Sequence, residues 1–358
     1  MIDLLERLVV VPGPSGFEDA VATAIRAEVE DLGDVTIDSI GNLILRLPAA
    51  EGAPSLMLMA HMDQVGLLVK WVDADGFLYC DANGLVDARA LLGVRVTVWA
   101  DGGPLPGVVG VGSPHVLGDH ERDRVPPIND LWIDVGAGSP DGAAALGIDA
   151  GTPVTLVGPP ERMGEHLFVS GCIDNRAGCA VLVEVARAAR DLEVELVFVW
   201  STQEEIGSRG ARVAAHWIQP TIAVVIDTMP AGDPSTPARV ATASVGRGPV
   251  IRAQDTRGMQ GTIYHLPIRK RLVEIARAND IPYQTDVFPT WTDAAEVHLA
   301  GRGVPTGGIF IPRRCSHSAS EVVDVRDIER TIDILRELVT VDAAAVAELG
   351  RRPTFPPA

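Results

Sequence analysis

The sequence predicts an α/β protein in which a doubly wound sheet is interrupted by a small inserted β-barrel. Near-continuous apolar runs such as ELVFVW (195–200) and TIAVVI (221–226) alternate with helical segments after residue 161, which is typical of buried parallel strands and the helices between them. Earlier in the chain, short β-rich pieces such as LLVKWV and RVTVWA are separated by Gly, Pro and Asp turns. The expected division is 1–66 and 162–349 for the α/β domain, 67–161 for the barrel and 350–358 for a disordered tail.

The α/β elements are expected in the following order. Two helices precede residue 32, and between them, in the turn PGPSGFE, Ser15 would cap the second helix. The segment 35–48 alternates as a strand, and the apolar run 54–59 leads into a buried strand that ends at His61. After the barrel, helices are predicted at 175–190, 208–216 and 269–279, with a final helix from about 325 to 349. In such a sheet, functional side chains gather at the carboxyl ends of the strands.

The bulk composition excludes several classes of protein. The 358 residues carry a net charge of -18, which argues against nucleic-acid binding because that requires a basic face. Cys80, Cys172, Cys179 and Cys315 show no CxxC spacing, so we expect reduced thiols in a cytoplasmic protein. The N-terminus lacks the pattern of a signal peptide, and no apolar run approaches the length of a membrane span.

Acidic residues and histidines directly follow several of the apolar runs. They are His61, Asp63, Asp174, Glu204, Glu205, Asp227 and His317. Ionised groups at the ends of core strands are costly to bury unless something compensates their charge, and a metal cation is the usual compensation. Five of these side chains can supply the oxygen and nitrogen ligands of two divalent ions, and a sixth is left as a base.

His61 and Asp63 stand two residues apart in AHMDQVG, at the predicted strand end. Residues two apart in an extended segment point the same way. Asp63 can therefore accept the spare ring N–H of His61 and fix the tautomer that binds a metal. A capped turn after the strand explains the same two residues without a metal.

Asp174 stands in CIDNRAGC, just before a predicted helix. Aspartate is a good N-cap, and this interpretation is compatible with metal binding, because one carboxylate can face the helix and bridge two cations. Asp227 ends its apolar run and would hold the first ion with His61, while His317 and Glu205 would hold the second.

Glu204 and Glu205 follow the strand ELVFVWS as adjacent like charges, which disfavours their joint ionisation. One solution makes Glu205 a metal ligand and leaves Glu204 as the general base over the metal-bound water. The alternative is a solvated pair at the start of a helix. The remaining histidines are expected at the surface or in packing, namely His115, His120, His166, His216, His265 and His298. Among them, His115 could face the site or a neighbouring subunit.

In this order, the motifs AHMDQVG, DNRAGC and TQEEIGSRGA, the aspartate after VVI and the HS near the C-terminus resemble the tetrahedral (TET) aminopeptidases. The segments GVVGVGSPHVL and LWIDVGAGSPDGAAALGIDAGTPVTL resemble the dimerisation domain of that family, and WTDAAEV resembles its TDA segment. The likeness covers nearly the whole chain. Some members of the family carry the names glutamyl or deblocking aminopeptidase, and others carry the name endoglucanase.

The resemblance implies a phosphorylase/hydrolase-like mixed sheet with helices on both faces and a PDZ-like barrel insert. It implies two metal ions, usually zinc or cobalt, bridged by Asp174. His61 and Asp227 would hold one ion, Glu205 and His317 the other, with Glu204 as base on the bridging water and Asp63 beside it. It also implies a homo-oligomer built from dimers, often a hollow dodecamer, that cleaves short peptides. Two departures, Gln64 in place of Glu and Cys315 in place of Tyr, bear on substrate and metal preference.

Three other functions compete with an aminopeptidase. A two-metal deacylase or carboxypeptidase would share the catalytic fold, but such enzymes usually carry an α/β lid in place of the β-rich insert. A non-catalytic scaffold would not need the complete ligand set together with Glu204. A glycosidase also uses a carboxylate pair, but adjacent glutamates tied to a set of histidines do not suit it.

Overall fold

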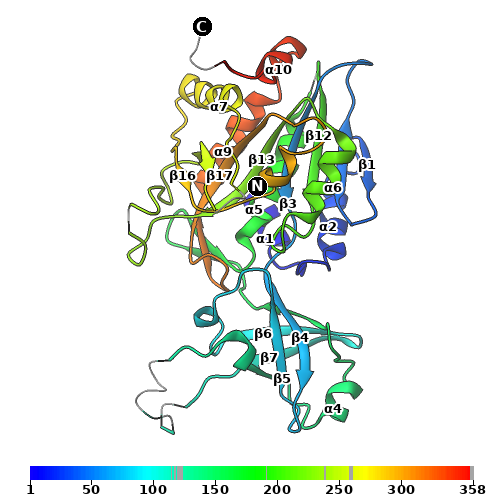
Figure 1. Ribbon diagram of the computed structural model, residues 1–358, viewed down its shortest axis with the longest axis vertical. Helices are drawn as coiled ribbons and strands as arrows, with labels where there is room; N and C mark the ends of the chain where they lie inside the picture. Colours follow the sequence, from blue (N-terminus) through cyan, green and yellow to red (C-terminus); the bar gives the residue numbers. More distant parts are fainter. Residues whose placement is uncertain are drawn as a thin grey trace.

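The computed structural model of the chain describes residues 1–113, 115–116, 118, 124–190, 192–237, 239–257 and 261–354. Figure 1 shows two parts, a large α/β part that contains both ends of the chain and a smaller, mainly β part below it, which also carries the helix α4. None of the helices in these ranges has both the length and the apolar content that a membrane crossing requires.

The α/β part is built on one large mixed sheet. Four strands at its centre run parallel. In spatial order, the sheet contains β1 (Asp34–Ile37), β2 (Leu43–Leu47), β12 (Glu195–Ser201), β3 (Ser55–His61), β13 (Ile222–Pro230), β17 (Thr306–Arg314), β18 (Glu321–Asp324), β11 (Leu167–Ser170) and β10 (Glu161–Met163). The short strand β14 (Val250–Ile251) pairs with β17, and β15 (Gln254–Asp255) pairs with β16 (Val287–Phe288) outside this sheet.

Helices cover both faces of the sheet, so its central strands are buried on both sides. In β3, Leu58 belongs to one hydrophobic cluster and its neighbour Met59 to the other, and both are fully buried. Because both sets of alternate side chains are covered, the strands read as continuous apolar runs. The first cluster lies under α1 (Ile2–Leu8), α2 (Asp19–Val29), α5 (Ile173–Ala188), α7 (Leu266–Ala278) and α9 (Val325–Leu338). The second lies under α6 (Arg209–Ile218) and α8 (Ala294–Val297).

The mainly β part is a closed barrel with a core of its own. Around the barrel the strands are β4 (Gly66–Val72), β5 (Leu78–Asn83), β8 (Trp132–Asp134), β7 (Gly103–Val109), β6 (Arg95–Ala100) and β9 (Pro153–Leu156). Leu78, Leu91 and Val98 are fully buried in a cluster separate from the two of the sheet. The helix α4 (Pro140–Ala145) begins with Ser139, whose side chain accepts the Gly142 N–H. The expected fold class, a doubly wound sheet with an inserted barrel, is confirmed, while the domain limits at 66, 161 and 349 stay a prediction.

Three local expectations were wrong. Ser15 does not cap a helix: α2 begins at Asp19, and the Ser15 hydroxyl donates to Asp63. The predicted strand over 35–48 is a hairpin, β1 and β2, because the Asp38 carboxylate accepts three main-chain N–H groups in the turn between them.

The predicted final helix is two helices. It breaks between α9 and α10 (Ala343–Leu349), where Asp342 caps the second helix by accepting the Ala345 N–H. In the tail, residues 350–354 carry no helix or strand beyond the cap of α10, and residues 355–358 lie outside the described ranges.

The separate core of the barrel leads to a prediction. Leu78→Ala should lower the free energy of unfolding by about 2–5 kcal/mol, because it removes a fully buried side chain and leaves a cavity. Val108→Ala, at a position 47% exposed on strand β7 of the same barrel, should change it by less than about 0.5 kcal/mol. Urea denaturation of both variants measures the difference, and equal midpoints would contradict the assigned core.

Candidate active site

The candidate site lies at the carboxyl edge of the sheet, where the parallel strands end. His61 is the last residue of β3, and the register places Ser201, the last residue of β12, directly opposite it. Asp227 lies in the second half of β13, and His317 lies in the turn after β17. Strand β18 is antiparallel to both β17 and β11, so β11 runs in the same direction as the central strands. It ends at Ser170, shortly before Asp174. Parallel strand order therefore brings residues that are far apart in sequence to one edge.

The structure brings the five predicted metal ligands together around Asp174. The Nε2 atom of His61 lies 3.3 Å from Asp174 Oδ1 and 3.3 Å from Asp227 Oδ1. On the other side, His317 Nε2 lies 3.2 Å from Asp174 Oδ2 and 3.5 Å from Glu205 Oε1. The ligand atoms of His61, Asp174 and Glu205 all lie within 4.8 Å of one another. Each oxygen of the Asp174 carboxylate thus faces a different histidine.

The donor set and its unmet hydrogen bonds fit divalent metal ions. Asp174 Oδ1 and Glu205 Oε1 are buried and have no hydrogen-bond partner among the described residues. A buried acceptor without a partner is costly, and a cation is a partner that both oxygens can share. Carboxylate oxygens and imidazole nitrogens are also the ligands of catalytic zinc sites.

The carboxylates of the site repel one another at close range. Burial, reinforced by Glu205 and Asp227 and opposed by His61, raises the pKa of Glu204 well above its usual range. Burial likewise raises the pKa of Glu205 to about 8. Asp174 differs: burial opposes its ionisation, but Arg313 and the two histidines hold its pKa well below the usual range. Bound cations would favour the ionised form of every carboxylate here.

Asp63 is fully buried and positions its neighbours. Its carboxylate accepts the main-chain N–H groups of Glu204 at 2.9 Å and Glu205 at 3.1 Å, and the Ser15 hydroxyl at 2.6 Å. The Nδ1 atom of His61 lies 3.4 Å from its Oδ1 and 3.2 Å from its main-chain oxygen. Asp63 therefore orients the imidazole and also fixes the turn that carries the two glutamates.

The Glu204 side chain lines the same small cavity as the candidate ligands. The preceding residue, Gln203, has a positive φ of 56° and donates its main-chain N–H to Glu18. Positive φ is also found at Cys172 and at His317. Non-glycine residues adopt this conformation rarely and tend to do so at functional sites, so local backbone strain coincides with the candidate site.

Four functional-site residues escaped the sequence analysis. They are Glu18, Asp293, Arg313 and Glu321. Asp293 accepts a hydrogen bond from Ser201, and burial raises its pKa to about 7. Arg313 directly follows the apolar run IFIP, as several of the acids and histidines follow theirs. The metal argument concerns acids and histidines, because an arginine is not a metal ligand. No local pattern marks Glu18 or Glu321.

The two departures from the family pattern do not touch the candidate ligands directly. Gln64 Oε1 accepts the Gly13 N–H at 3.2 Å and an Arg176 N–H at 3.1 Å, so its amide holds the buried arginine of the DNRAGC motif. Cys315 is exposed. His115 is exposed in the barrel part, and His120 lies outside the described residues.

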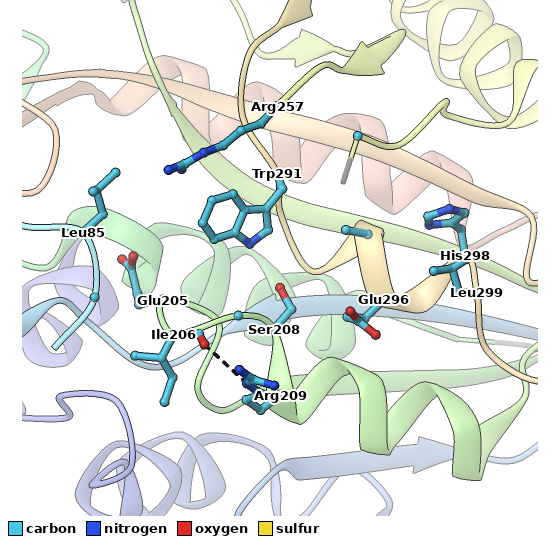
Figure 2. A pocket seen from close by; sticks show the side chains of 14 residues that line it. Leu85, Glu205, Ile206, Ser208, Arg209, Arg257, Trp291, Glu296, His298 and Leu299 are labelled. Atoms are coloured by element: carbon cyan, nitrogen blue, oxygen red, sulfur yellow. Dashed lines mark hydrogen bonds between the residues drawn. The ribbon is translucent and has the colours of Figure 1, made fainter. Parts of the chain in front are cut away.

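A larger cavity of about 730 Å³ opens beside the candidate ligands. It shares Leu85, Glu205, Arg257 and Trp291 with the cavity of about 210 Å³ that the ligands line. Figure 2 shows Arg257 and Trp291 along one wall, with Glu205 at one end and Glu296 and His298 at the other. His298, expected as a surface or packing residue, thus lines this cavity.

Comparison with known proteins identifies relatives over almost the full length. Residues 41–334 match the model of the M42 glutamyl aminopeptidase family. A putative aminopeptidase of Acetivibrio thermocellus is 34% identical over 95% of this chain and 98% of its own. An aminopeptidase of the archaeon Desulfurococcus kamchatkensis has a structure that superposes with a TM-score of 0.92 at 32% identity, covering 97% of both chains. The Pyrococcus horikoshii TET1 peptidase, which can assemble into a tetrahedron or a large octahedral shell, gives a TM-score of 0.85 at 30% identity, covering 94% of this chain and 98% of that one.

Proposed function

The chain belongs to the M42 glutamyl aminopeptidase family and is a metalloaminopeptidase, and we propose that it works with two divalent cations and with Glu204 as general base. The observation that carries this proposal is the position of Asp174, whose two carboxylate oxygens face His61 on one side and His317 on the other.

In this proposal, His61 and Asp227 hold one ion, Glu205 and His317 hold the other, and Asp174 contributes to both. Zinc and cobalt suit this set of oxygen and nitrogen ligands. When bound, such ions polarise the scissile carbonyl and lower the pKa of a water molecule toward 7.

Glu204 supplies the proton transfer in this proposal. Its carboxylate takes a proton from the attacking water as the new C–O bond forms, and then gives that proton to the amine that leaves as the C–N bond breaks. The Glu204 side chain lines the same cavity as the proposed ligands, and bound cations would favour its ionised form, the form that can accept a proton. Asp63 keeps Glu204 in place through the main-chain N–H.

The cavity of Figure 2 is the proposed place for the side chain of the N-terminal residue. It opens directly beside Glu205, and its volume of about 730 Å³ exceeds that of any natural side chain. Short peptides are the proposed substrates, because an aminopeptidase acts on the first residue of a peptide chain. We propose a cytoplasmic location because all four cysteines are free thiols, as is usual in a reducing compartment.

The Glu204→Gln variant tests the base. We expect turnover to fall about 100- to 10,000-fold, because the amide cannot accept the proton, while metal content and melting temperature stay at the wild-type level. Glu205→Gln is the matched contrast: it removes a proposed ligand one residue away and should lose metal as well as activity. Aminoacyl-anilide hydrolysis and elemental analysis give both readouts, and near-normal turnover in Glu204→Gln would refute the role.

Metal removal is a second test. A chelator should abolish hydrolysis, and Zn²⁺ or Co²⁺ should restore it, with two equivalents bound per chain by elemental analysis. The Asp174→Ala variant should bind neither ion tightly, because the carboxylate lies between both histidines. Full activity in protein shown to be free of metal would overturn the proposal.

We further propose a homo-oligomer built from dimers, a dodecamer by analogy with the PhTET1-12s structure, whose asymmetric unit is a dodecamer. Light scattering on the purified protein should give a mass near twelve times that of one chain. A monomer under all salt conditions would contradict this.

A further inference from the structure

We propose that the ion pair between Arg313 and Glu321 is a positioning device that holds Asp174 and His317 in the arrangement that binds the ion between Glu205 and His317. This inference rests on the proposed two-metal function and concerns residues that supply no metal ligand themselves. Both side chains of the pair are 2% exposed.

Arg313 connects three separate segments at the site. Its guanidinium contacts the carboxylates of Asp174 and Glu321 and donates from Nε to the Thr228 hydroxyl at 2.6 Å. Thr228 in turn donates its main-chain N–H to Asp227 Oδ1 at 2.7 Å. Arginine suits this place because its rigid planar fork donates in several fixed directions at once, which a lysine ammonium does not.

Glu321 holds the main chain of two proposed ligands. Its Oε2 accepts the Asp174 N–H at 2.9 Å, and its Oε1 accepts the His317 N–H at 2.8 Å. These residues come from the start of α5 and from the turn between β17 and β18, so no local sequence links them. Arg313 pairs with Glu321 at its Oε1 and so compensates the charge of a buried carboxylate whose two oxygens accept these main-chain N–H groups.

The turn between β17 and β18 needs such support. Cys315 and His317 both have a φ of 56°, a left-handed conformation that non-glycine residues adopt only where the surroundings enforce it. Arg313 lies just before this turn and Glu321 just after it, so their ion pair closes the turn at its base.

The geometry also gives the pair an unequal effect on the two ions. Glu321 fixes the backbone of His317, a proposed ligand of only one ion, and Arg313 contacts the Asp174 oxygen on the His317 side. On the other side, His61 is oriented by Asp63 and not by the pair. Loss of the pair should therefore lower the affinity for the ion at Glu205 and His317 more than the affinity for the ion at His61 and Asp227.

Stepwise titration of the metal-stripped, full-length protein with Co²⁺ tests the unequal effect on the two ions. Calorimetry and visible absorption measure the binding of each equivalent. The His317→Ala variant identifies which bound equivalent belongs to the His317 side. We expect Glu321→Gln and Arg313→Met to bind that same equivalent about 10- to 100-fold more weakly, as is typical when a partner of a ligand is removed. The other equivalent should lose less affinity, because the pair reaches its ligands only through the shared Asp174 and through Thr228 beside Asp227.

Two controls separate positioning from general stability. Arg326→Met removes an ion pair to Asp324 at the end of the same strand β18, without touching a ligand, and should leave both equivalents unchanged. Arg313→Lys keeps the charge and should retain more affinity than Arg313→Met. At saturating Co²⁺, turnover of Glu321→Gln should return close to the wild-type level, because the reacting groups are intact.

Wild-type affinity for both ions in Glu321→Gln and Arg313→Met would overturn the inference, and so would a loss no larger than that of Arg326→Met. If Arg313→Met does not fold, Glu321→Gln decides alone, since glutamine preserves the shape and one acceptor. A wild-type protein that binds no metal would defeat the proposed function and this inference together, whereas two tightly bound ions in every variant would defeat this inference alone.

Discussion

Mutual repulsion among buried carboxylates at the carboxyl edge of the sheet is the constraint on which the site depends. Those that meet there include Asp63, Asp174, Glu204, Glu205, Asp227 and Asp293, all less than a tenth exposed. Hydrogen bonds from main-chain N–H groups satisfy Asp63, and Arg313 compensates part of the charge on Asp174. The unpartnered oxygens of Asp174 and Glu205 remain. Divalent cations would resolve both problems at once, since they would add positive charge and take up the free oxygens.

The sheet makes this concentration of charge possible. Burial of β3, β12 and β13 on both faces, between two hydrophobic clusters, leaves the strand ends as the place where polar side chains can gather without disrupting the core. The parallel register then aligns those ends, so that His61 and the residues after Ser201 arrive at the same level. Two of the candidate ligands, His61 and Asp227, are thus held by buried central strands of the sheet, and rigid elements of this kind suit a site that must keep a defined geometry.

Most of the candidate ligands were predictable because they carry a local signal, a charged or imidazole side chain at or just after the end of an apolar run. His317 does not, because residues 313–316 separate it from the run IFIP. Partners that act across the fold carry no such signal. Ser15 looks like a helix cap in sequence, but its hydroxyl bonds to Asp63, 48 residues away. Glu321 opens a short strand and bonds to the main chain of Asp174, 147 residues away, as well as to that of His317 in the turn before the strand. The break before α10 was missed for another reason: Val339 and Val341 are buried and continue the apolar pattern through it.

The barrel is more than an appended module, because one of its loops forms part of the site. After β5, the Leu85 carbonyl lies 2.6 Å from His317 Nδ1, the ring nitrogen opposite the one that faces Asp174. An N–H at Nδ1 that bonds to this carbonyl leaves Nε2 free as a metal ligand. The adjacent Gly84 has a φ of 91°, and a Cβ there would lie 3.1 Å from Glu205 Cβ and 2.9 Å from Val65, so only glycine allows the loop to approach. The barrel therefore offers an acceptor that favours the Nδ1–H tautomer of one proposed ligand, and it packs closely against another.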